Sequence, residues 1–269
     1  MNSPYFLFDI GGSRTRVATS FDGKNLTNVH IFSTPKNYDE ALSLLGKTAK
    51  EMVGGKIGLA VGGVPGQIDK RGNLYAWNNL KPWSGSSIEP DLRARLDCPV
   101  KLTNDTALVG LGEAVYGSGK GKEIVAYVTI STGVNGVRIV NKQIDASARG
   151  FEIGRQIIDC RSSKNWEEKV SGMFLAQNHG KPARNISDDN VWKRVSHKVG
   201  IGLVNVALFW SPDVIVLGGA VTQSLDLKMI KKVFKNNLSQ YETDIGIKKT
   251  KLRQEAGLRG ALYQALTLA

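Results

Sequence analysis

The sequence has 269 residues, of which 41% are hydrophobic and 22% charged, so it excludes a disordered chain and a very small domain. Because this length exceeds the size at which one hydrophobic core usually stops growing, two lobes are expected. The 36 Lys and Arg against 24 Asp and Glu give a net charge of +12, which marks either a nucleic-acid binder or a solvated surface that attracts anions.

Targeting and cysteine signals point to an ordinary cytoplasmic protein. No apolar run approaches the roughly 18 residues of a membrane span, and residues 1–4 lead into a strand without a basic, then apolar, leader. We therefore expect a cytoplasmic location and no membrane partner. Cys98 and Cys160 are the two cysteines, and neither has a cysteine neighbour at zinc-site spacing.

The first part of the chain alternates strands and helices, which is typical of an α/β lobe. Alternation and turn residues predict strands at 5–9, 15–20 and one ending near Phe32, with turns at Gly11-Gly12 and Asp22-Gly23. There follow a helix at 39–52, a strand at 56–63, a turn at Pro65-Gly66, a helix at 87–96 and a strand at 99–103.

The second part repeats this plan after a predicted helix from Asp105 to Gly117. A strand at 123–130 opens a hairpin, and a helix at 189–210, a strand at 214–219 and a helix at 227–237 follow. A last helix at 257–268 is expected to pack back across the lobe junction. The predicted domains are therefore 1–104 with 257–269, and 105–256.

The basic excess gathers in residues 228–253, where a predicted helix carries lysines on one side and apolar residues on the other. Phe234, the aromatic residue of this helix, lies on its apolar side and not among the lysines, whereas a platform for single-stranded nucleic acid requires aromatic residues between the basic ones. We therefore favour a solvated helix face over a nucleic-acid contact.

Three glycine turns follow three predicted strands. Gly11 and Gly12 precede Ser13 and Thr15, and the other two turns are Ser131-Thr132-Gly133 and Gly218-Gly219. The first does not match a Rossmann or P-loop fingerprint, since a strand follows it and not a helix. Such turns can still bind phosphate, because residues without Cβ let backbone N–H groups converge on an anion. A nucleotide clamped between the lobes is predicted, with Gly218-Gly219 approaching the adenine ring.

Asp9 ends the first strand, next to the first of these turns. Its carboxylate would repel phosphate unless Mg²⁺ stood between them, held through waters. The alternative interpretation is a tight hairpin with a capping aspartate, and this stretch alone does not decide between the two.

The chain resembles the ROK family of sugar kinases, within the actin-like ATPase superfamily, from residue 5 to about 265. The likeness rests on five segments in the family's order: FDIGGSRTRVA, LTNDTALVGLGEAVYG, ISTGVNGVRIV, GFEIG and GLVNVALFWSPDVIVLGGAV. It implies an α/β fold of two ribonuclease-H-like lobes with a central cleft for ATP and a hexose. It also suggests a homodimer.

The resemblance implies roles for individual residues. The family aspartate that matches Asp105 takes the proton from the sugar's primary hydroxyl, and a carboxylate at a helix N-terminus suits this role because the dipole keeps it ionised. The alternative is that Asp105 only caps the helix. The matches to positions that bind sugar hydroxyls are Asn104, Glu152 and Glu167, with Gly66 and Asn79 as less secure additions.

Tryptophans and one substituted motif are harder to interpret. Trp77, Trp83 and Trp166 either line the sugar pocket or belong to the core, the commoner case. Arg155 stands where the family has a histidine that binds sugar and a structural zinc, and a guanidinium cannot ligate zinc, so no zinc is predicted. Arg155 either donates to a sugar hydroxyl or pairs with a nearby acid. Asn135 replaces a usual glycine, which is tolerable because Asn enters positive φ.

The leading interpretation is an ATP- and Mg²⁺-dependent kinase for the 6-hydroxyl of glucose or a close relative. An N-acetylhexosamine kinase, acting on N-acetylmannosamine or N-acetylglucosamine, is the nearest competitor. A catalytically degenerate sugar sensor is the alternative from another class, since the family includes repressors. These carry an N-terminal DNA-binding segment, for which the strand from Tyr5 leaves no room, so no nucleic-acid partner is expected.

Overall fold

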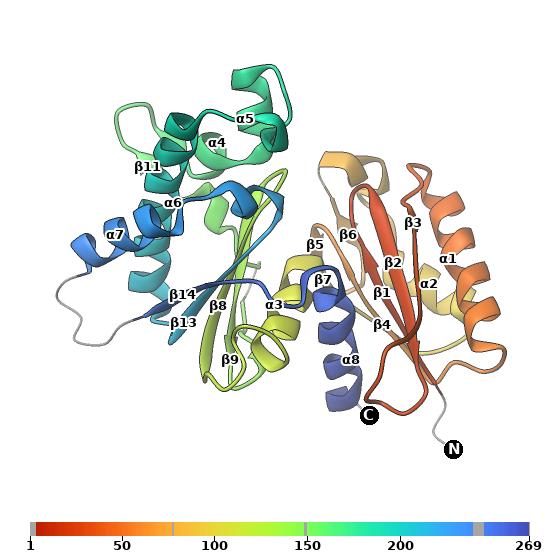
Figure 1. Cartoon of the computed structure of the whole chain (residues 1–269). Coiled ribbons are helices and arrows are strands. Elements are labelled where there is room, and N and C mark those ends of the chain that lie inside the picture. The colour runs from red at the N-terminus through yellow and green to blue at the C-terminus, as the bar shows by residue number, and fades with distance from the viewer. Residues whose placement is uncertain (1–3, 77, 148–149, 239–244, 269) are drawn as a thin grey trace. The chain divides into compact units, whose positions relative to one another are not determined.

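The computed structural model describes residues 4–76, 78–147, 150–238 and 245–268 (Figure 1). The chain divides into two compact units, which we call unit 1 (Met1–Tyr116 and Gln254–Ala269) and unit 2 (Gly117–Arg253). Among the described residues, no helix combines the length and the apolar character needed to cross a membrane.

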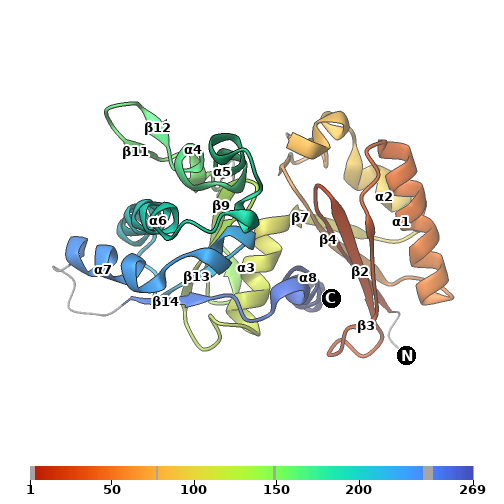
Figure 2. The ribbon, with the colours of Figure 1, turned by 45° about the horizontal axis from the view of Figure 1, so that its top comes forward.

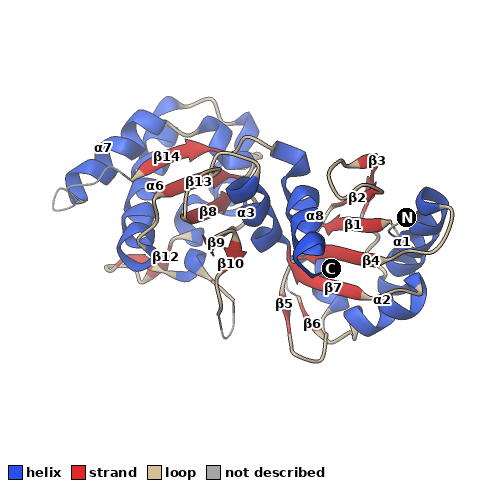
Figure 3. Cartoon of the chain, turned by 90° about the horizontal axis from the view of Figure 1, so that it is seen from below, coloured by secondary structure: helices blue, strands red, loops and turns tan. Residues whose placement is uncertain are grey.

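Unit 1 is built on a five-stranded sheet in the order β3-β2-β1-β4-β7 (Figure 3). The strands β1, β2 and β3 are antiparallel neighbours, whereas β4 and β7 continue the sheet in parallel with β1. Its elements are β1 (Tyr5–Ile10), β2 (Arg14–Ser20), β3 (Thr27–Ser33), α1 (Tyr38–Val53), β4 (Leu59–Val64), β5 (Gln67–Ile68), β6 (Leu74–Tyr75), η1 (Asn78–Trp83), α2 (Ile88–Leu96), β7 (Val100–Asn104), α3 (Asp105–Val115) and α8 (Ala256–Leu268), with η5 (Arg253–Glu255) leading into α8.

Helices cover both faces of this sheet (Figure 1). The alternation of β1 sends Phe6 and Phe8 into the core shared with α1 and α2, while Leu7 joins the core beneath α8. The helix α1 begins where Asn37 accepts a hydrogen bond from the Glu40 amide and ends at Gly54 in the left-handed conformation, the usual cap at each end.

The helices α3 and α8 pack backbone to backbone. A methyl group at Gly112 would overlap the Ala256 carbonyl, and one at Gly260 would overlap the Leu108 carbonyl. This close approach explains why α3 belongs to unit 1, so that the division falls after Tyr116 and not before Asp105 as the sequence led us to expect. The last helix does pack onto the unit-1 sheet, with Leu258, Leu262 and their neighbours buried.

Unit 2 repeats the plan with a sheet in the order β10-β9-β8-β13-β14, again with an antiparallel half and a parallel half. Figure 2 shows the β11–β12 hairpin leading into α4, with α5 after it. The elements are β8 (Ile124–Ile130), β9 (Val134–Val140), β10 (Gln143–Ile144), η2 (Ile153–Arg155), β11 (Ile157–Asp159), β12 (Lys164–Asn165), α4 (Glu167–Val170), α5 (Gly172–His179), η3 (Ala183–Asn185), α6 (Asp189–Trp210), β13 (Val214–Gly218), η4 (Ala220–Ser224), α7 (Leu227–Asn237) and β14 (Gly246–Lys249).

The core of unit 2 lies between the sheet and α6. Trp166 is fully buried there, and its indole occupies the space that Gly202 of α6 leaves open. Trp83 is likewise a core residue of unit 1, with its Nε1 donating to the Lys36 carbonyl at 2.9 Å. Of the three tryptophans considered for the pocket, these two are core, and Trp77 lies outside the described residues.

The basic helix α7 has the expected two sides. Ile230, Val233 and Phe234 are buried, and the lysines of the other side are exposed: Lys228, Lys231, Lys232 and Lys235. The side chains thus form a solvated charged face over an apolar one.

Candidate functional site

The first glycine turn joins β1 to β2 and is tight because Gly11 approaches its own chain. The Gly11 amide donates to the Arg14 carbonyl at 2.9 Å, and a Cβ at Gly11 would lie 2.9 Å from that oxygen. Gly12 faces Asn79, whose Cβ would lie 3.1 Å from a side chain placed there. Neither glycine has a positive φ, so close packing explains the absence of side chains.

Asp9 lies at the carboxyl end of β1, opposite Arg16 of β2. Its side chain is buried against α8, where a Cβ at Gly257 would come within 2.9 Å of the carboxyl carbon. The Arg16 Nη1 lies 3.7 Å from the Asp9 Oδ2 and forms an ion pair with it. Burial raises the pKa of Asp9 to about 6, although the Arg16 guanidinium acts to lower it.

The helix α3 begins immediately after β7, and the two residues at this junction have separate tasks. Asn104 is the N-cap: its Oδ1 accepts from the Ala107 amide at 3.2 Å, and its Nδ2 donates to the Gly66 carbonyl at 3.0 Å. The alternative interpretation, that Asp105 only caps the helix, is therefore wrong, because Asn104 is the cap. The Asp105 Oδ1 accepts from the Thr106 amide at 2.7 Å.

Asp9 and Asp105 flank the end of β4. Gly63 pairs with Asp9 in the parallel register, and a Cβ at Gly63 would lie 2.9 Å from the Cα of Asp105. Desolvation and, second, the charge of Asp9 raise the pKa of Asp105 to about 7, against hydrogen bonds from Thr106 that lower it. Unit 1 thus holds two electrostatically coupled carboxyls, both with raised pKa values.

The other residues predicted in unit 1 lie at two different places. Asn79 is exposed and reaches Ser13, with its Nδ2 3.5 Å from the Ser13 Oγ. Thr15 is buried on the opposite face of the sheet from Asp9, where its hydroxyl is 2.9 Å from the Thr34 hydroxyl. The structure therefore does not bring the Thr15 side chain to Asp9, because neighbouring residues of a strand face opposite ways.

The second glycine turn, Ser131-Thr132-Gly133, joins β8 to β9 and contacts the start of α5. The Ser131 amide donates to the Gly133 carbonyl at 2.8 Å, so this amide is used within the turn. The Ser131 carbonyl accepts from the Gly172 amide at 2.7 Å and the Thr132 carbonyl from the Met173 amide at 3.2 Å. These bonds fix the turn against the helix.

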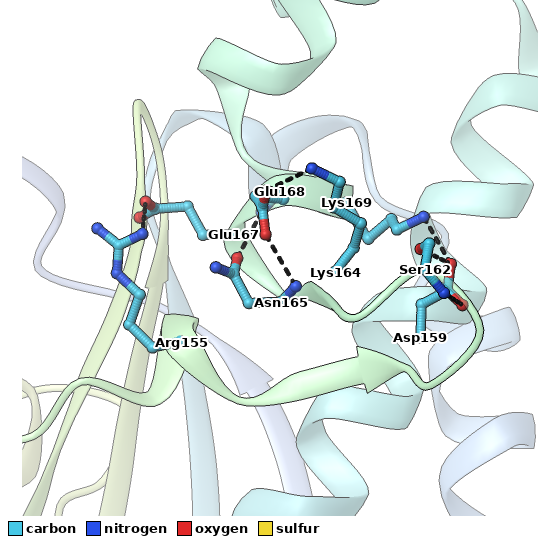
Figure 4. A network of polar contacts seen from close by, with 8 residues as sticks. All are labelled: Arg155, Asp159, Ser162, Lys164, Asn165, Glu167, Glu168 and Lys169. Carbon is cyan, nitrogen blue, oxygen red and sulfur yellow. Dashed lines mark hydrogen bonds and ion pairs between the residues drawn. The ribbon is translucent and has the colours of Figure 1, made fainter.

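Glu167 lies directly beside this turn. Its Oε2 accepts from the Val134 amide at 2.8 Å, and a Cβ at Gly133 would come within 2.5 Å of the same oxygen. The glycine at 133 is therefore needed to admit a carboxylate of the chain itself. Of the two roles weighed for Arg155, the structure shows pairing with an acid: its Nη1 lies 3.5 Å from the Glu167 Oε1 (Figure 4).

Glu152 completes this acidic group. Burial raises its pKa, the nearby Arg155 lowers it, and the negative charge of Glu167 raises it further. Unit 2 thus brings together the second glycine turn, both predicted sugar-binding carboxylates and Arg155.

The third turn, Gly218-Gly219, follows β13. A Cβ at Gly218 would overlap the Tyr127 hydroxyl, and one at Gly219, where φ is +92°, would overlap the Ile130 backbone. Packing within the chain therefore explains why both positions are glycine. The adenine contact of this turn stays a prediction.

The residues of unit 1 offer oxygen ligands to a metal ion. No group of three or more His, Cys, Asp or Glu in the described residues is placed to hold a metal ion. Mg²⁺ needs no such cage, since it is commonly bound through one or two carboxylates, waters and substrate phosphates, and Asp9 fits that chemistry. Cys98 is buried in unit 1 and Cys160 exposed in unit 2.

Three residues that contact Asp9 or the first glycine turn were not predicted from the sequence. Arg16 was detectable, because a turn flanked by Ile10 and Thr15 sets Arg16 opposite Asp9. Thr34, whose hydroxyl donates to the Gly11 carbonyl at 2.7 Å, and Gly257 gave no local signal, since they meet the site only through the fold.

Comparisons with known proteins agree with this architecture. The glucokinase of Streptomyces coelicolor (strain ATCC BAA-471 / A3(2) / M145) is 24% identical, over 94% of each chain. The ROK hexokinase structure from Thermus thermophilus matches with a TM-score of 0.85 and 24% identity, covering 99% of this chain and 100% of that one. A ROK family glucokinase from Streptomyces griseus, in complex with glucose and AMPPNP, matches with a TM-score of 0.80 and 21% identity, over 98% and 99%.

The structural matches confirm the α/β class and the actin-like ATPase fold. The family model described as "ROK family" matches residues 5–267. Since that match covers nearly the whole chain, this chain belongs to the ROK family.

Proposed function

We propose that the chain is an ATP-dependent sugar kinase that transfers the γ-phosphate to the 6-hydroxyl of a hexose, with glucose as the preferred substrate. The observation that carries the proposal is Asp105, a carboxyl at the start of α3 whose pKa is raised to about 7. A general base works best when its pKa lies near the operating pH. The glucokinase and hexokinase relatives support the same reaction class.

Asp105 accepts the proton of the attacking hydroxyl in this proposal. Asn104 caps α3 and is tied to Gly66, so the backbone that carries Asp105 is held in place. The Thr106 amide holds one carboxylate oxygen, Oδ1, which leaves Oδ2 to face the substrate. Phosphoryl transfer relies mainly on positioning and charge stabilisation, so a rigid carboxylate fits the task.

Asp9 is the residue that would hold Mg²⁺ in the proposed site. A buried carboxylate with a raised pKa gains from a cation, which replaces the lost water and favours the ionised form. When bound, Mg²⁺ neutralises charge on the phosphate oxygens of ATP. The turns at Gly11-Gly12-Ser13 and Ser131-Thr132-Gly133 are the proposed phosphate contacts, and Gly218-Gly219 the proposed adenine contact.

The sugar is proposed to meet the carboxylates of Glu152 and Glu167 and the side chains of Asn104 and Asn79. Carboxylates accept hydrogen bonds and amides also donate them, so this set recognises pairs of sugar hydroxyls. The proposed sugar-binding residues of unit 2 are two carboxylates, Glu152 and Glu167, beside one guanidinium, Arg155. This excess of negative charge favours an uncharged hexose over an anionic one. A homodimer is part of the proposal, and light scattering would measure its mass.

A coupled assay for ADP release over a hexose panel tests the function. Glucose, mannose, fructose, N-acetylglucosamine and N-acetylmannosamine are offered with MgATP, and we expect the highest kcat/KM for glucose. A preference for an N-acetyl sugar would select the competing kinase. Sugar binding by calorimetry without turnover on any sugar would select the sensor and refute the proposal.

A further inference from the structure

The carboxylate of Glu167 is held at both of its oxygens. Oε2 accepts from the Val134 amide at 2.8 Å, and Oε1 lies 3.5 Å from the Arg155 Nη1. The side chain is only 18% exposed, so it has little freedom apart from these two contacts. Its position thus depends on the start of β9 at one oxygen and on Arg155 at the other.

Arg155 reaches Glu167 from another element. It is the last residue of η2, and Figure 4 shows its guanidinium pointing toward the Glu167 carboxylate. The arginine side chain is 58% exposed, so the attraction is screened and modest in water. An interaction of this kind orients a side chain and contributes little to the stability of the fold.

The same guanidinium acts on Glu152, three residues before it. Arg155 lowers the pKa of Glu152, whereas burial and Glu167 raise it. The Arg155 amide also donates to the Glu152 carbonyl at 3.0 Å, so the backbone fixes these two residues to each other. Without the Arg155 charge, Glu152 would take up a proton more readily. Arg155 therefore favours the ionised, accepting form of Glu152.

The rest of α4 is anchored without Arg155. Glu168 accepts from the Lys164 ammonium at 2.8 Å and from the Asn165 amide at 3.0 Å, and Lys169 donates to Asp159 at 2.7 Å (Figure 4). The Trp166 ring is also buried against Gly202. Removing Arg155 should therefore release the Glu167 side chain and leave the helix in place.

We propose that Arg155 is a positioning residue: it holds the Glu167 carboxylate in place, and its charge keeps Glu152 available, as acceptors for the hydroxyls of an uncharged sugar. This inference rests on the proposed kinase function. Arg155 acts through the two acids and is not itself the group that binds the sugar. It makes sugar affinity, and not the chemical step, depend on the pair.

Arg155→Gln tests the proposal by steady-state kinetics. We expect the KM for sugar to rise about 5- to 10-fold, with kcat and the KM for ATP within about twofold. Arg155→Lys should restore most of the affinity. Arg161→Gln, in the exposed loop of the β11–β12 hairpin, should change nothing.

Hydrogen exchange gives a readout without turnover. In the sugar-free protein, Arg155→Gln should speed exchange of the Val134 amide, which donates to Glu167, about 2- to 5-fold. The Asn165 amide, which donates to Glu168, should keep its rate. An unchanged sugar KM, or an unchanged Val134 rate, overturns the inference. Absence of turnover in the unaltered chain refutes the proposed function instead, and the Val134 rate then decides the role of Arg155 alone.

Discussion

Replacing Asp105 by asparagine removes the proposed proton acceptor while keeping the shape of the side chain. Because Asn104 and not Asp105 caps α3, the helix start should survive the change. General bases typically contribute 10²- to 10⁴-fold, so kcat should fall at least about 100-fold. Nucleotide affinity should stay within about threefold.

The raised pKa predicts that the same substitution stabilises the fold. The shift from 3.8 to about 7 is about 3 units, and at about 1.36 kcal/mol per unit the upper bound is about 4 kcal/mol. Partial exposure of Asp105 and the shared charge with Asp9 reduce this to about 1–3 kcal/mol.

The sign follows from proton linkage. The folded state binds this proton more tightly than the unfolded state, so the unaltered protein loses stability as the pH rises from about 4 to about 7. Asparagine has no proton to lose. The gain in free energy of unfolding of Asp105→Asn over the unaltered protein should therefore be full at pH 8 and absent below pH 4. If Asp105 had a purely structural role, Asp105→Asn would instead lower both the stability of the protein and its activity.

Two measurements on purified protein decide the matter. ADP release gives kcat, and urea unfolding of the ligand-free protein at pH 8 and pH 4 gives the free energy of unfolding. Asp97→Asn is the matched control, since Asp97 is exposed, ends α2 at a φ of 50° that asparagine tolerates, and should leave both quantities unchanged. If Asp105→Asn kept kcat within about threefold, or was destabilised at pH 8, the assignment of Asp105 as a desolvated base would be wrong.

Three further outcomes are expected. Asp9→Asn should weaken MgATP binding at least about 10-fold by calorimetry and abolish its dependence on Mg²⁺, and retention of that dependence would remove Asp9 from the site. Metal analysis after dialysis should find well under one zinc per chain, and one full equivalent would show a site that Arg155 was expected to exclude. Gly260→Ala should lower the free energy of unfolding by about 1–3 kcal/mol, because its methyl would overlap the Leu108 carbonyl, whereas Gly55→Ala, with open space around it, should be nearly neutral.

Local patterns were sufficient for much of the fold. The strand at Tyr5–Ile10 and the glycine turn after it were predicted because apolar alternation and missing side chains are local properties. The helix beginning at Asp105 was predicted for the same reason. The placement of Glu167 beside the second glycine turn was not predicted, because it depends on how α4 is anchored and not on any spacing in the sequence.

Side-chain direction and packing account for the places where the structure differs from the sequence-based picture. Thr15 sits one residue from Arg16 and therefore faces the other side of the sheet. Asn135 was expected at positive φ, but it pairs with Thr129 within β9, and its Oδ1 accepts from the Gly136 amide at 2.8 Å. The units divide after Tyr116 because the contact between Gly112 and α8 joins segments far apart in the chain.

The discontinuity of unit 1 has a consequence for synthesis on the ribosome. The apolar face formed by Leu7, Val61 and Leu108 is covered by α8, which is translated only after all of unit 2. During elongation that face stays open to water or to chaperones while unit 2 already has its full sequence. Unit 2 is thus the first part of the chain able to reach its native state, and release of the α8 segment from the exit tunnel is the event that lets unit 1 finish.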